Sequence, residues 1–198
     1  MCEPALLDLL LAKIVLSKKV KLGAALSGGE PTLVFDRVVK IIKALKSGYG
    51  KEFHIHLYTN GSNLTENAVN ELAKAGLDEM RVNSLNPKIF RVLIGSPFDV
   101  VCEIPCLPSE KYLNAVLRLI DNFPQLGVGY LNLNETEVTQ ENSSFFKRLG
   151  LFSDNSRILG SHEAAERITE YCKVIGGIEV FFCTYETADR IRIERNRQ

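Results

Sequence analysis

The sequence predicts an α/β protein built on a parallel sheet, and three observations support this class. Short apolar segments alternate with amphipathic segments of helical period along the chain. Successive apolar segments lie roughly 20 to 50 residues apart, which leaves room for the crossover helix that parallel pairing requires. A length of 198 residues with 45% hydrophobic and 24% charged residues is enough for one globular core.

The first elements surround a glycine-rich turn. Leucines on one stripe after Pro4 predict a helix to about Leu16. The apolar stretch Leu22–Leu26 predicts a short strand, which stops at Gly28-Gly29-Glu30-Pro31. Apolar residues beyond this turn repeat with helical spacing, and the helix they predict ends near Gly48.

The middle of the chain repeats the same unit. Phe53–Tyr58 predicts a strand that ends in Thr59-Asn60-Gly61. Thr65 is a suitable N-cap for the next helix, and Gly76 is a suitable stop before a strand at Glu79–Asn83.

The remaining elements follow from the same signals of period, cap and turn. Region 135–159 is the least regular part and is long enough to contribute a loop over a site. The predicted elements are a short helix after Pro87, strand Phe98–Ile104, a helix capped by Ser109, strand Val128–Leu133, a short helix at Ser143–Leu149, helix Glu163–Val174, strand Ile178–Phe182 and a solvated arginine-rich end.

The turn at Gly28-Gly29-Glu30-Pro31 is the candidate ligand site. Two glycines without Cβ atoms permit positive φ and let a bound molecule approach the backbone closely. Glu30 adds a negative charge suited to a ligand amine, and Pro31 stiffens the turn. The alternative is a tight strand-to-helix turn without a ligand.

Polar residues also interrupt strands that a parallel sheet should bury on both faces. If these faces point into a barrel, they form a polar lumen with a ligand site at the carboxyl ends of the strands. The alternative is that they lie at strand ends or form a satisfied internal network. The residues are His54, His56, Tyr58, Arg81, Asn83, Glu103, Asn132 and Asn134.

Composition limits the partners and the location. Twenty-four basic residues balance twenty-four acidic residues, so overall charge predicts neither a nucleic acid nor an anionic membrane as partner. The apolar run near the start is too short to span a bilayer. Five cysteines, an odd number without a CxxC pair, fit reduced thiols, so we expect a cytoplasmic protein with a small-molecule ligand.

Four motifs, in this order along the chain, resemble those of the radical S-adenosylmethionine superfamily. The resemblance is to an uncharacterised archaeal-type branch related to pyruvate formate-lyase activating enzymes. The motifs are Gly28-Gly29-Glu30-Pro31, Thr59-Asn60-Gly61, Cys102-Glu103-Ile104-Pro105 and Leu131-Asn132-Leu133-Asn134-Glu135. The resemblance covers residues 1–198 as a single domain. It implies a partial (β/α)6, half-TIM-like barrel, and because a helix is predicted first, the first strand is expected to be missing.

The resemblance also implies a cofactor and its contacts. S-adenosylmethionine would lie across the top of the barrel, with its amino group at the glycine turn, its ribose near the third predicted strand and its adenine near the fourth and fifth. The residues implied, in that order, are Gly28, Gly29, Glu30 and Pro31 with Thr59 and Asn60 in the next loop, then Asn83 and Ser84, then Ile104, Asn132 and Asn134.

The sequence departs from the family pattern in its cysteines. The family holds a four-iron four-sulfur cluster with CxxxCxxC, and these 198 residues contain no such motif. Cys102 and Cys106 have its first spacing, but Ser109 stands at the third position, which favours coincidence. We therefore expect no cluster on this chain alone and no radical chemistry by itself. Three explanations for the missing motif stay open: a shortened chain, a split enzyme whose first part is another chain, or a degenerate member kept for binding.

Two other functions remain open. One is a non-catalytic module that binds an adenosyl ligand, and the other is a metal-dependent barrel hydrolase that uses His54 and His56, which share a strand face. Because the first strand is expected to be missing, the Leu22–Leu26 strand is expected to have a free edge, which another chain, such as a second copy, or the N-terminal segment would cover.

Overall fold

A six-stranded, fully parallel sheet forms the centre of the protein in the computed structural model, which describes residues 23–154 and 156–187. Neighbouring strands follow one another along the chain, which confirms the predicted α/β class and gives a partial barrel. The strands in spatial order are β1 (Gly23–Leu26), β2 (His54–Thr59), β3 (Glu79–Val82), β4 (Asp99–Cys106), β5 (Tyr130–Glu135) and β8 (Glu179–Cys183).

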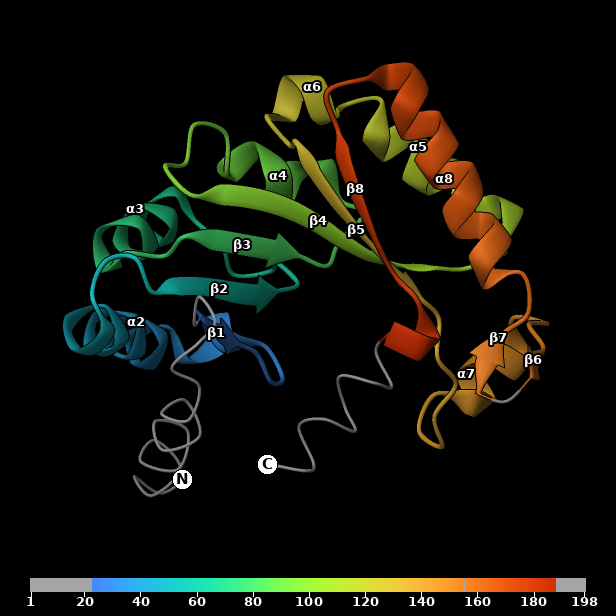
Figure 1. The fold of residues 1–198 in the computed structure, drawn as a ribbon, viewed down its shortest axis with the longest axis horizontal. Coiled ribbons are helices and arrows are strands. Elements are labelled where there is room, and N and C mark those ends of the chain that lie inside the picture. The colour runs from blue at the N-terminus through green and yellow to red at the C-terminus, as the bar shows by residue number, and fades with distance from the viewer. Residues whose placement is uncertain (1–22, 155, 188–198) are drawn as a thin grey trace.

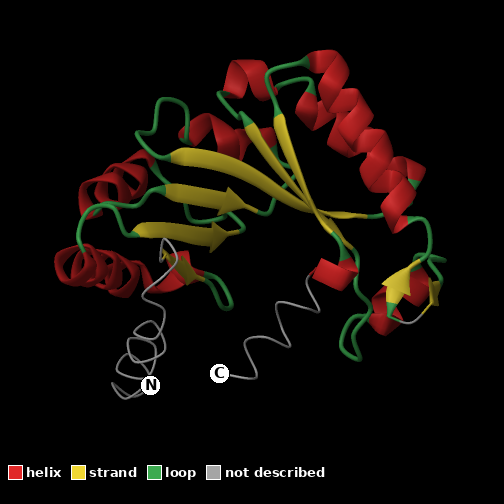
Figure 2. Cartoon of the chain, viewed as in Figure 1, coloured by secondary structure: helices red, strands yellow, loops and turns green. Residues whose placement is uncertain are grey.

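Helices lie on the outer side of this curved sheet, where α2 to α5 and α8 follow one another around it (Figures 1 and 2). Each connects two parallel strands, as a crossover must. The helical segments are η1 (Pro31–Val34), α2 (Phe35–Tyr49), α3 (Glu66–Ala75), α4 (Pro87–Val92), α5 (Glu110–Ile120), α6 (Phe123–Leu126), α7 (Ser143–Arg148) and α8 (Ser161–Ile175). No helix within the described ranges is long and apolar enough to cross a membrane.

The helix ends that local signals predict are confirmed for α3 and only partly for α5. The Thr65 hydroxyl accepts a hydrogen bond from the Ala68 amide at the start of α3, and Gly76 ends that helix in a left-handed conformation. Ser109 precedes α5 as predicted, but its side chain makes no capping hydrogen bond. The helix predicted from Pro4 and the arginine-rich end lie outside the described residues.

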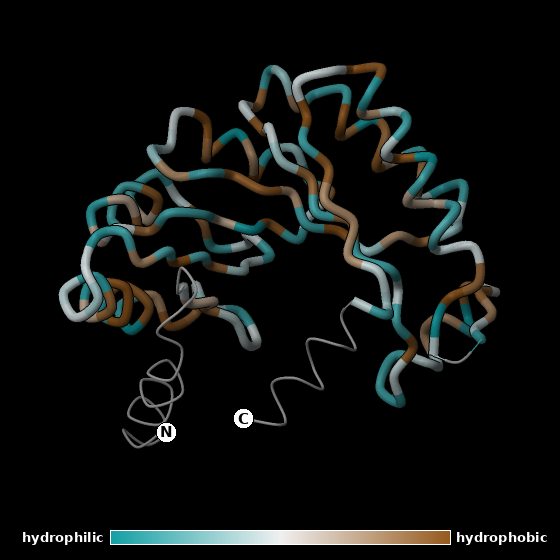
Figure 3. Tube along the Cα trace, in the orientation of Figure 1, coloured by the Kyte–Doolittle hydropathy of each residue, from teal (hydrophilic) through white to brown (hydrophobic). Residues whose placement is uncertain are grey.

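The strands separate an apolar side from a polar side. Ile55 and Leu57 of β2 are fully buried under the helices, whereas His56 and Tyr58, which alternate with them, are half-buried on the other side. Figure 3 shows strongly hydrophobic and hydrophilic residues following one another along the strands. The period-2 pattern therefore decides which side chains enter the helix-covered core and which face inward.

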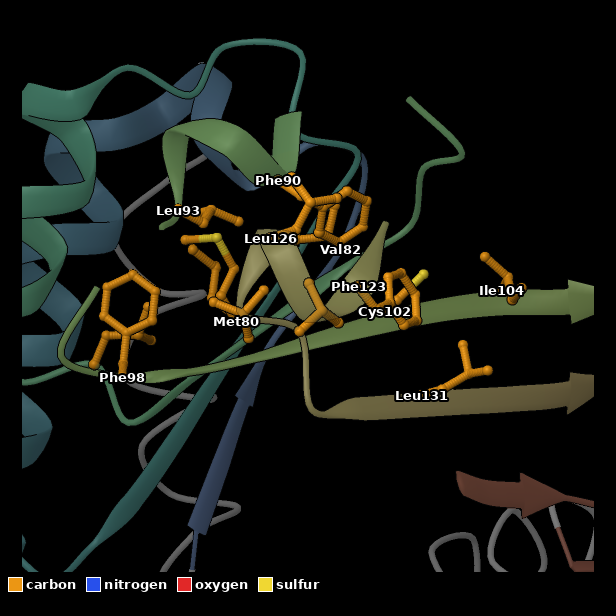
Figure 4. Close-up of a cluster of buried hydrophobic side chains, with 14 of the residues drawn as sticks. Met80, Val82, Phe90, Leu93, Phe98, Cys102, Ile104, Phe123, Leu126 and Leu131 are labelled. Atoms are coloured by element: carbon orange, nitrogen blue, oxygen red, sulfur yellow. The ribbon is translucent and has the colours of Figure 1, made fainter. Parts of the chain in front are cut away.

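The core between sheet and helices is built on large buried side chains. Phe90 of α4 and Phe123 of α6 are both fully buried, with ring centroids 6.2 Å apart. Met80 and Cys102 from the sheet lie in the same cluster (Figure 4). This cluster anchors α4 and α6 to the middle strands.

Region 135–160 holds one predicted element and two that were not predicted. Helix α7 (Ser143–Arg148) confirms the short helix expected there. An antiparallel pair, β6 (Ser153–Asp154) and β7 (Arg157–Ile158), was not predicted, because two-residue strands are too short to show an alternating pattern.

Candidate functional site

The glycine turn, Gly28-Gly29-Glu30-Pro31, follows the end of β1. Gly28 and Gly29 have positive φ angles of 117° and 20°. A Cβ atom at either position would meet nothing within 4 Å, so open space lies beside both residues. The backbone of the turn is therefore accessible to a ligand in the way that the two glycines predict.

The Glu30 carboxylate joins this turn to the end of β2. Its Oε1 accepts hydrogen bonds from the Thr32 amide at 3.0 Å, the Thr32 hydroxyl at 2.6 Å and the Thr59 hydroxyl at 2.7 Å. Its Oε2 accepts one from the Asn60 amide at 2.7 Å. The carboxylate thus binds its own chain four times, and one acceptor position remains on Oε2 for a ligand ammonium.

These bonds also set the charge of Glu30. Burial acts to raise the pKa of its carboxyl, but hydrogen bonds from Thr32, Asn60 and Thr59 outweigh burial and lower the pKa below its ordinary value of 4.5. Hydrogen bonding to the charged form of a carboxyl has this effect. Glu30 is therefore ionised at neutral pH.

The TNG turn, Thr59-Asn60-Gly61, is held by its own residues and by α4. The buried Thr59 hydroxyl accepts a hydrogen bond from the Gly61 amide at 3.0 Å, and the Asn60 side chain accepts one from the Ser62 amide at 2.8 Å. Gly61 has φ of 76°, and a Cβ atom there would lie 2.3 Å from Cγ2 of Ile89. Glycine is required at this position because the turn is left-handed and packed directly against α4.

The third strand ends beside the second. The Asn83 amide donates to the Thr59 carbonyl at 2.9 Å, which places Asn83 and Ser84 next to the TNG turn. The exposed Asn83 side chain and the half-buried Ser84 therefore stand at the same edge of the sheet as Glu30. Parallel strands bring their carboxyl ends to one edge, so this grouping follows from the topology.

The inner face of the sheet, opposite the helices, carries a polar network that includes most of the predicted polar residues but neither the His56 nor the Asn83 side chain. The Arg81 guanidinium donates to the Glu79 carboxylate and to the Tyr58 hydroxyl at 3.0 Å. It also lies 3.6 Å from Oε2 of Glu103, and Glu79 contacts His54 at 3.2 Å. The network supports the predicted polar face, in which internal hydrogen bonding satisfies many of its groups.

Glu79 belongs to this network although the sequence reasoning did not single it out. Its position two residues before Arg81 was the available signal, because strand residues two apart share a face. Thr32, which donates twice to Glu30, was missed as well. Its two hydrogen bonds to Glu30 depend on the backbone conformation of the turn, which periodic sequence patterns do not predict.

His56 is a half-buried residue of the inner face. Burial, together with the positive charge of Arg81, lowers the pKa of His56 to about 4. The imidazole is therefore neutral at physiological pH. Its Nδ1 atom is buried without a hydrogen-bond partner among the described residues, and a ligand or water molecule could satisfy it.

Ile104 does not lie with the other predicted site residues. Its side chain is 2% exposed and belongs to the helix-covered core, whereas the neighbouring Glu103 faces inward. This position on the helix-covered side does not favour the expected apolar contact between the Ile104 side chain and an adenine. Asn132 and Asn134 of β5 do face inward, beside Glu103.

The two cysteines of β4 occupy core positions. Cys102 and Cys106 are fully buried on the helix side of β4, and burial raises the pKa of both thiols, that of Cys106 to about 12. A thiolate is the metal-binding form, so neither suits an iron ligand. Within residues 23–154 and 156–187, no group of three His, Cys, Asp or Glu side chains is arranged to hold a metal ion, and this includes the surroundings of His54 and His56.

Comparison with protein families gives an independent result. The family model of the radical S-adenosylmethionine superfamily matches residues 8–141. A protein of Methanocaldococcus jannaschii, named as a glycyl-radical enzyme activating enzyme, is 30% identical over 205 residues. That match covers 94% of this chain and 51% of the relative, so the chain spans about half the length of the curated relative it matches.

Among solved structures, the fold is similar to that of SuiB from Streptococcus suis, crystallised with S-adenosylmethionine. The TM-score is 0.62 at 14% identity, and the match covers 93% of this chain and 44% of SuiB. At this identity the likeness concerns the fold, and it agrees with the partial barrel described above.

Proposed function

The chain belongs to the radical S-adenosylmethionine superfamily, and from this premise we propose that it is a core domain that binds S-adenosylmethionine at the joined glycine and TNG turns. Members of this family bind S-adenosylmethionine and a four-iron four-sulfur cluster. One observation carries the proposal: Glu30 ties two loops from neighbouring strands together beside open backbone at Gly28 and Gly29. A ligand ammonium at the remaining acceptor position of Glu30 would form a charge-assisted contact.

The other predicted residues line the same edge in this proposal. Pro31 stiffens the turn at the start of η1. Asn83 and Ser84 would meet the ribose, and Asn132 with Asn134 would meet the adenine. Thr59 and Asn60 act through Glu30, since both donate to its carboxylate. S-adenosylmethionine supplies the adenosyl group in the chemistry of the family, and these residues would bind and orient it.

The described residues do not provide the ligands that a four-iron four-sulfur cluster needs. The cysteines of β4 are buried thiols in the core, and the sequence has no CxxxCxxC motif. We propose that this polypeptide by itself does not hold the cluster and does not carry out radical chemistry. An activating-enzyme reaction, as in the name of the M. jannaschii relative, is proposed only where a cluster-bearing segment completes the site. The cysteines among the described residues are free thiols, which fits a cytoplasmic location for this chain.

Binding is tested by a thermal-unfolding titration with S-adenosylmethionine. We expect a concentration-dependent rise in the unfolding temperature, because a ligand at 100 times its Kd stabilises the folded chain by about 2.7 kcal/mol. Adenosine serves as a control for binding of adenine and ribose alone. No shift at millimolar S-adenosylmethionine would refute the proposed site.

The cluster proposal is tested by anaerobic reconstitution with iron and sulfide. We expect no stoichiometric four-iron cluster on the 198-residue chain and no release of deoxyadenosine when S-adenosylmethionine and a reductant are added, because thiolate ligands are lacking. Iron analysis, electron paramagnetic resonance and chromatography of the nucleoside products measure this. One cluster per chain together with deoxyadenosine release would contradict the proposal. If the chain binds S-adenosylmethionine but holds no cluster and releases no deoxyadenosine, the isolated chain functions as an adenosyl-binding module.

A further inference from the structure

Glu103 on β4 holds two side-chain amides of the neighbouring strand. Its Oε2 accepts from Nδ2 of Asn132 at 3.3 Å, and its Oε1 accepts from Nδ2 of Asn134 at 3.0 Å. Glu103 lies directly opposite Asn132 in the strand register, and Pro105, which has no polar side chain, lies opposite Asn134. One carboxylate therefore serves both asparagines.

This arrangement decides which end of each amide faces the inner side of the barrel. An ionised carboxylate only accepts hydrogen bonds, so both asparagines must direct their NH2 groups toward Glu103 and their Oδ1 atoms away from it. In the described residues no hydrogen bond reaches either Oδ1 atom, and His56 Nδ1 is the one buried side-chain atom without a partner. Both amide oxygens therefore reach solvent as free acceptors.

We propose that Glu103 is a positioning residue that makes this edge of the site accept hydrogen bonds and so selects an amino-bearing purine over an oxo-bearing purine. The inference rests on the proposed function, in which Asn132 and Asn134 meet the adenine. The 6-amino group of adenine donates to such an edge. The 6-amino group has two protons and can donate one to each Oδ1 atom. The 6-oxo group of hypoxanthine has no proton and would oppose oxygen to oxygen, and since the only donor beside it is N1–H, at most one of the two acceptors could be paired.

The expected discrimination is about tenfold or more in Kd. When an asparagine Oδ1 atom faces the 6-oxo group of a ligand, a hydrogen bond is lost and a desolvated acceptor is left unpaired. Each 1.4 kcal/mol of binding free energy corresponds to a tenfold change in Kd. Partial exposure of both asparagines keeps the effect from being larger.

Glu103→Gln tests this orientation directly. A glutamine has one oxygen and one NH2 group, and Arg81, 3.6 Å from Oε2, favours the oxygen on its own side. The NH2 group then lies beside Asn134, which must turn over to present its oxygen to Gln and its own NH2 group to the ligand. The variant changes the donor pattern of the edge with little change in volume.

The experiment measures the Kd of S-adenosylhomocysteine and of S-inosylhomocysteine by calorimetry on the full chain. We expect the wild type to prefer the adenine ligand at least about tenfold and Glu103→Gln to reduce this preference to about threefold or less. Asp99→Asn is the matched control, since it removes a carboxylate from the same face of the same strand, and it should keep the wild-type preference. Equal binding of both ligands to the wild type, or an unchanged preference in Glu103→Gln, overturns the inference.

Asn134→Ala provides a second variant if Glu103→Gln does not fold. It removes one of the two acceptors at a half-buried position near the end of β5, and it should also reduce the preference. An unchanged preference in this variant overturns the inference as well. If the wild type binds neither ligand, the proposed function itself fails; if it binds both equally, only the role of Glu103 fails.

Discussion

Glu30→Ala is expected to weaken S-adenosylmethionine binding about 10- to 100-fold and to lower the free energy of unfolding by about 2 kcal/mol. The substitution leaves four donors without their acceptor, and two of them, on Thr59 and Asn60, belong to the TNG turn. Loss of the carboxylate therefore separates two loops as well as removing a charge. Isothermal titration and urea denaturation measure the two effects.

Asp36→Ala is the control for Glu30→Ala, because Asp36 is an exposed carboxylate at the start of α2. It should leave both affinity and stability close to the wild-type values. If Glu30→Ala binds as tightly as Asp36→Ala, the joined turns are not the ligand site.

Glu30 also makes stability depend on pH in a defined direction. Its pKa is lower in the folded chain than its ordinary value of 4.5, so its contribution to stability is complete above about pH 4.5 and is lost as the pH falls through the folded value. Urea denaturation across this range should therefore show a smaller loss of stability on acidification in Glu30→Gln than in the wild type. An identical loss in both proteins would assign the acid sensitivity to other carboxylates.

Gly61→Ala is expected to lower the free energy of unfolding by about 3 kcal/mol. The left-handed backbone at φ of 76° costs an L-residue about 1–2 kcal/mol, and the new methyl group would overlap Ile89 at 2.3 Å, which costs a further 1–3 kcal/mol or so. Because the methyl group pushes the TNG turn away from α4, Asn60 moves from Glu30 and S-adenosylmethionine affinity falls too. Urea denaturation measures the stability change.

Gly95→Ala separates the two costs of this substitution. Gly95 has nearly the same φ, 75°, but a Cβ atom there meets nothing within 4 Å, so only the backbone cost of about 1 kcal/mol applies. Combining Gly61→Ala with Ile89→Leu, which removes the γ2 methyl group, should recover part of the loss. Equal destabilisation by the two alanine substitutions would show that the contact with Ile89 is relieved at no cost.

The fold could be predicted from local patterns because its signals are short-range. Apolar runs and helical periods report burial directly, and Thr65 and Gly76 act on neighbouring residues, so α3 has its predicted ends. The pair β6 and β7 is held by tertiary contacts over two residues each, and local patterns did not report it.

The candidate site is divided in the same way. The glycine turn and the TNG turn were predictable as loops at strand ends, because glycine and its neighbours set the backbone conformation there. The alternation along β4 also placed Glu103 and Cys102 on opposite sides, but the same alternation puts Ile104 in the core, where its side chain cannot meet a ligand on the inner face.

The sequence by itself determined the fold class and the residues that stand at the carboxyl ends of the strands, because these depend on period and turn chemistry within a few residues. Tertiary structure alone decided what the polar groups do. Glu30 binds Thr59 and Asn60 from 29 and 30 residues away, and Glu103 orients Asn132 and Asn134 across a strand boundary. Hydrogen bonds depend on distance and direction. The hydrogen-bond partners of each carboxylate therefore depend on the parallel register, which places these residues side by side.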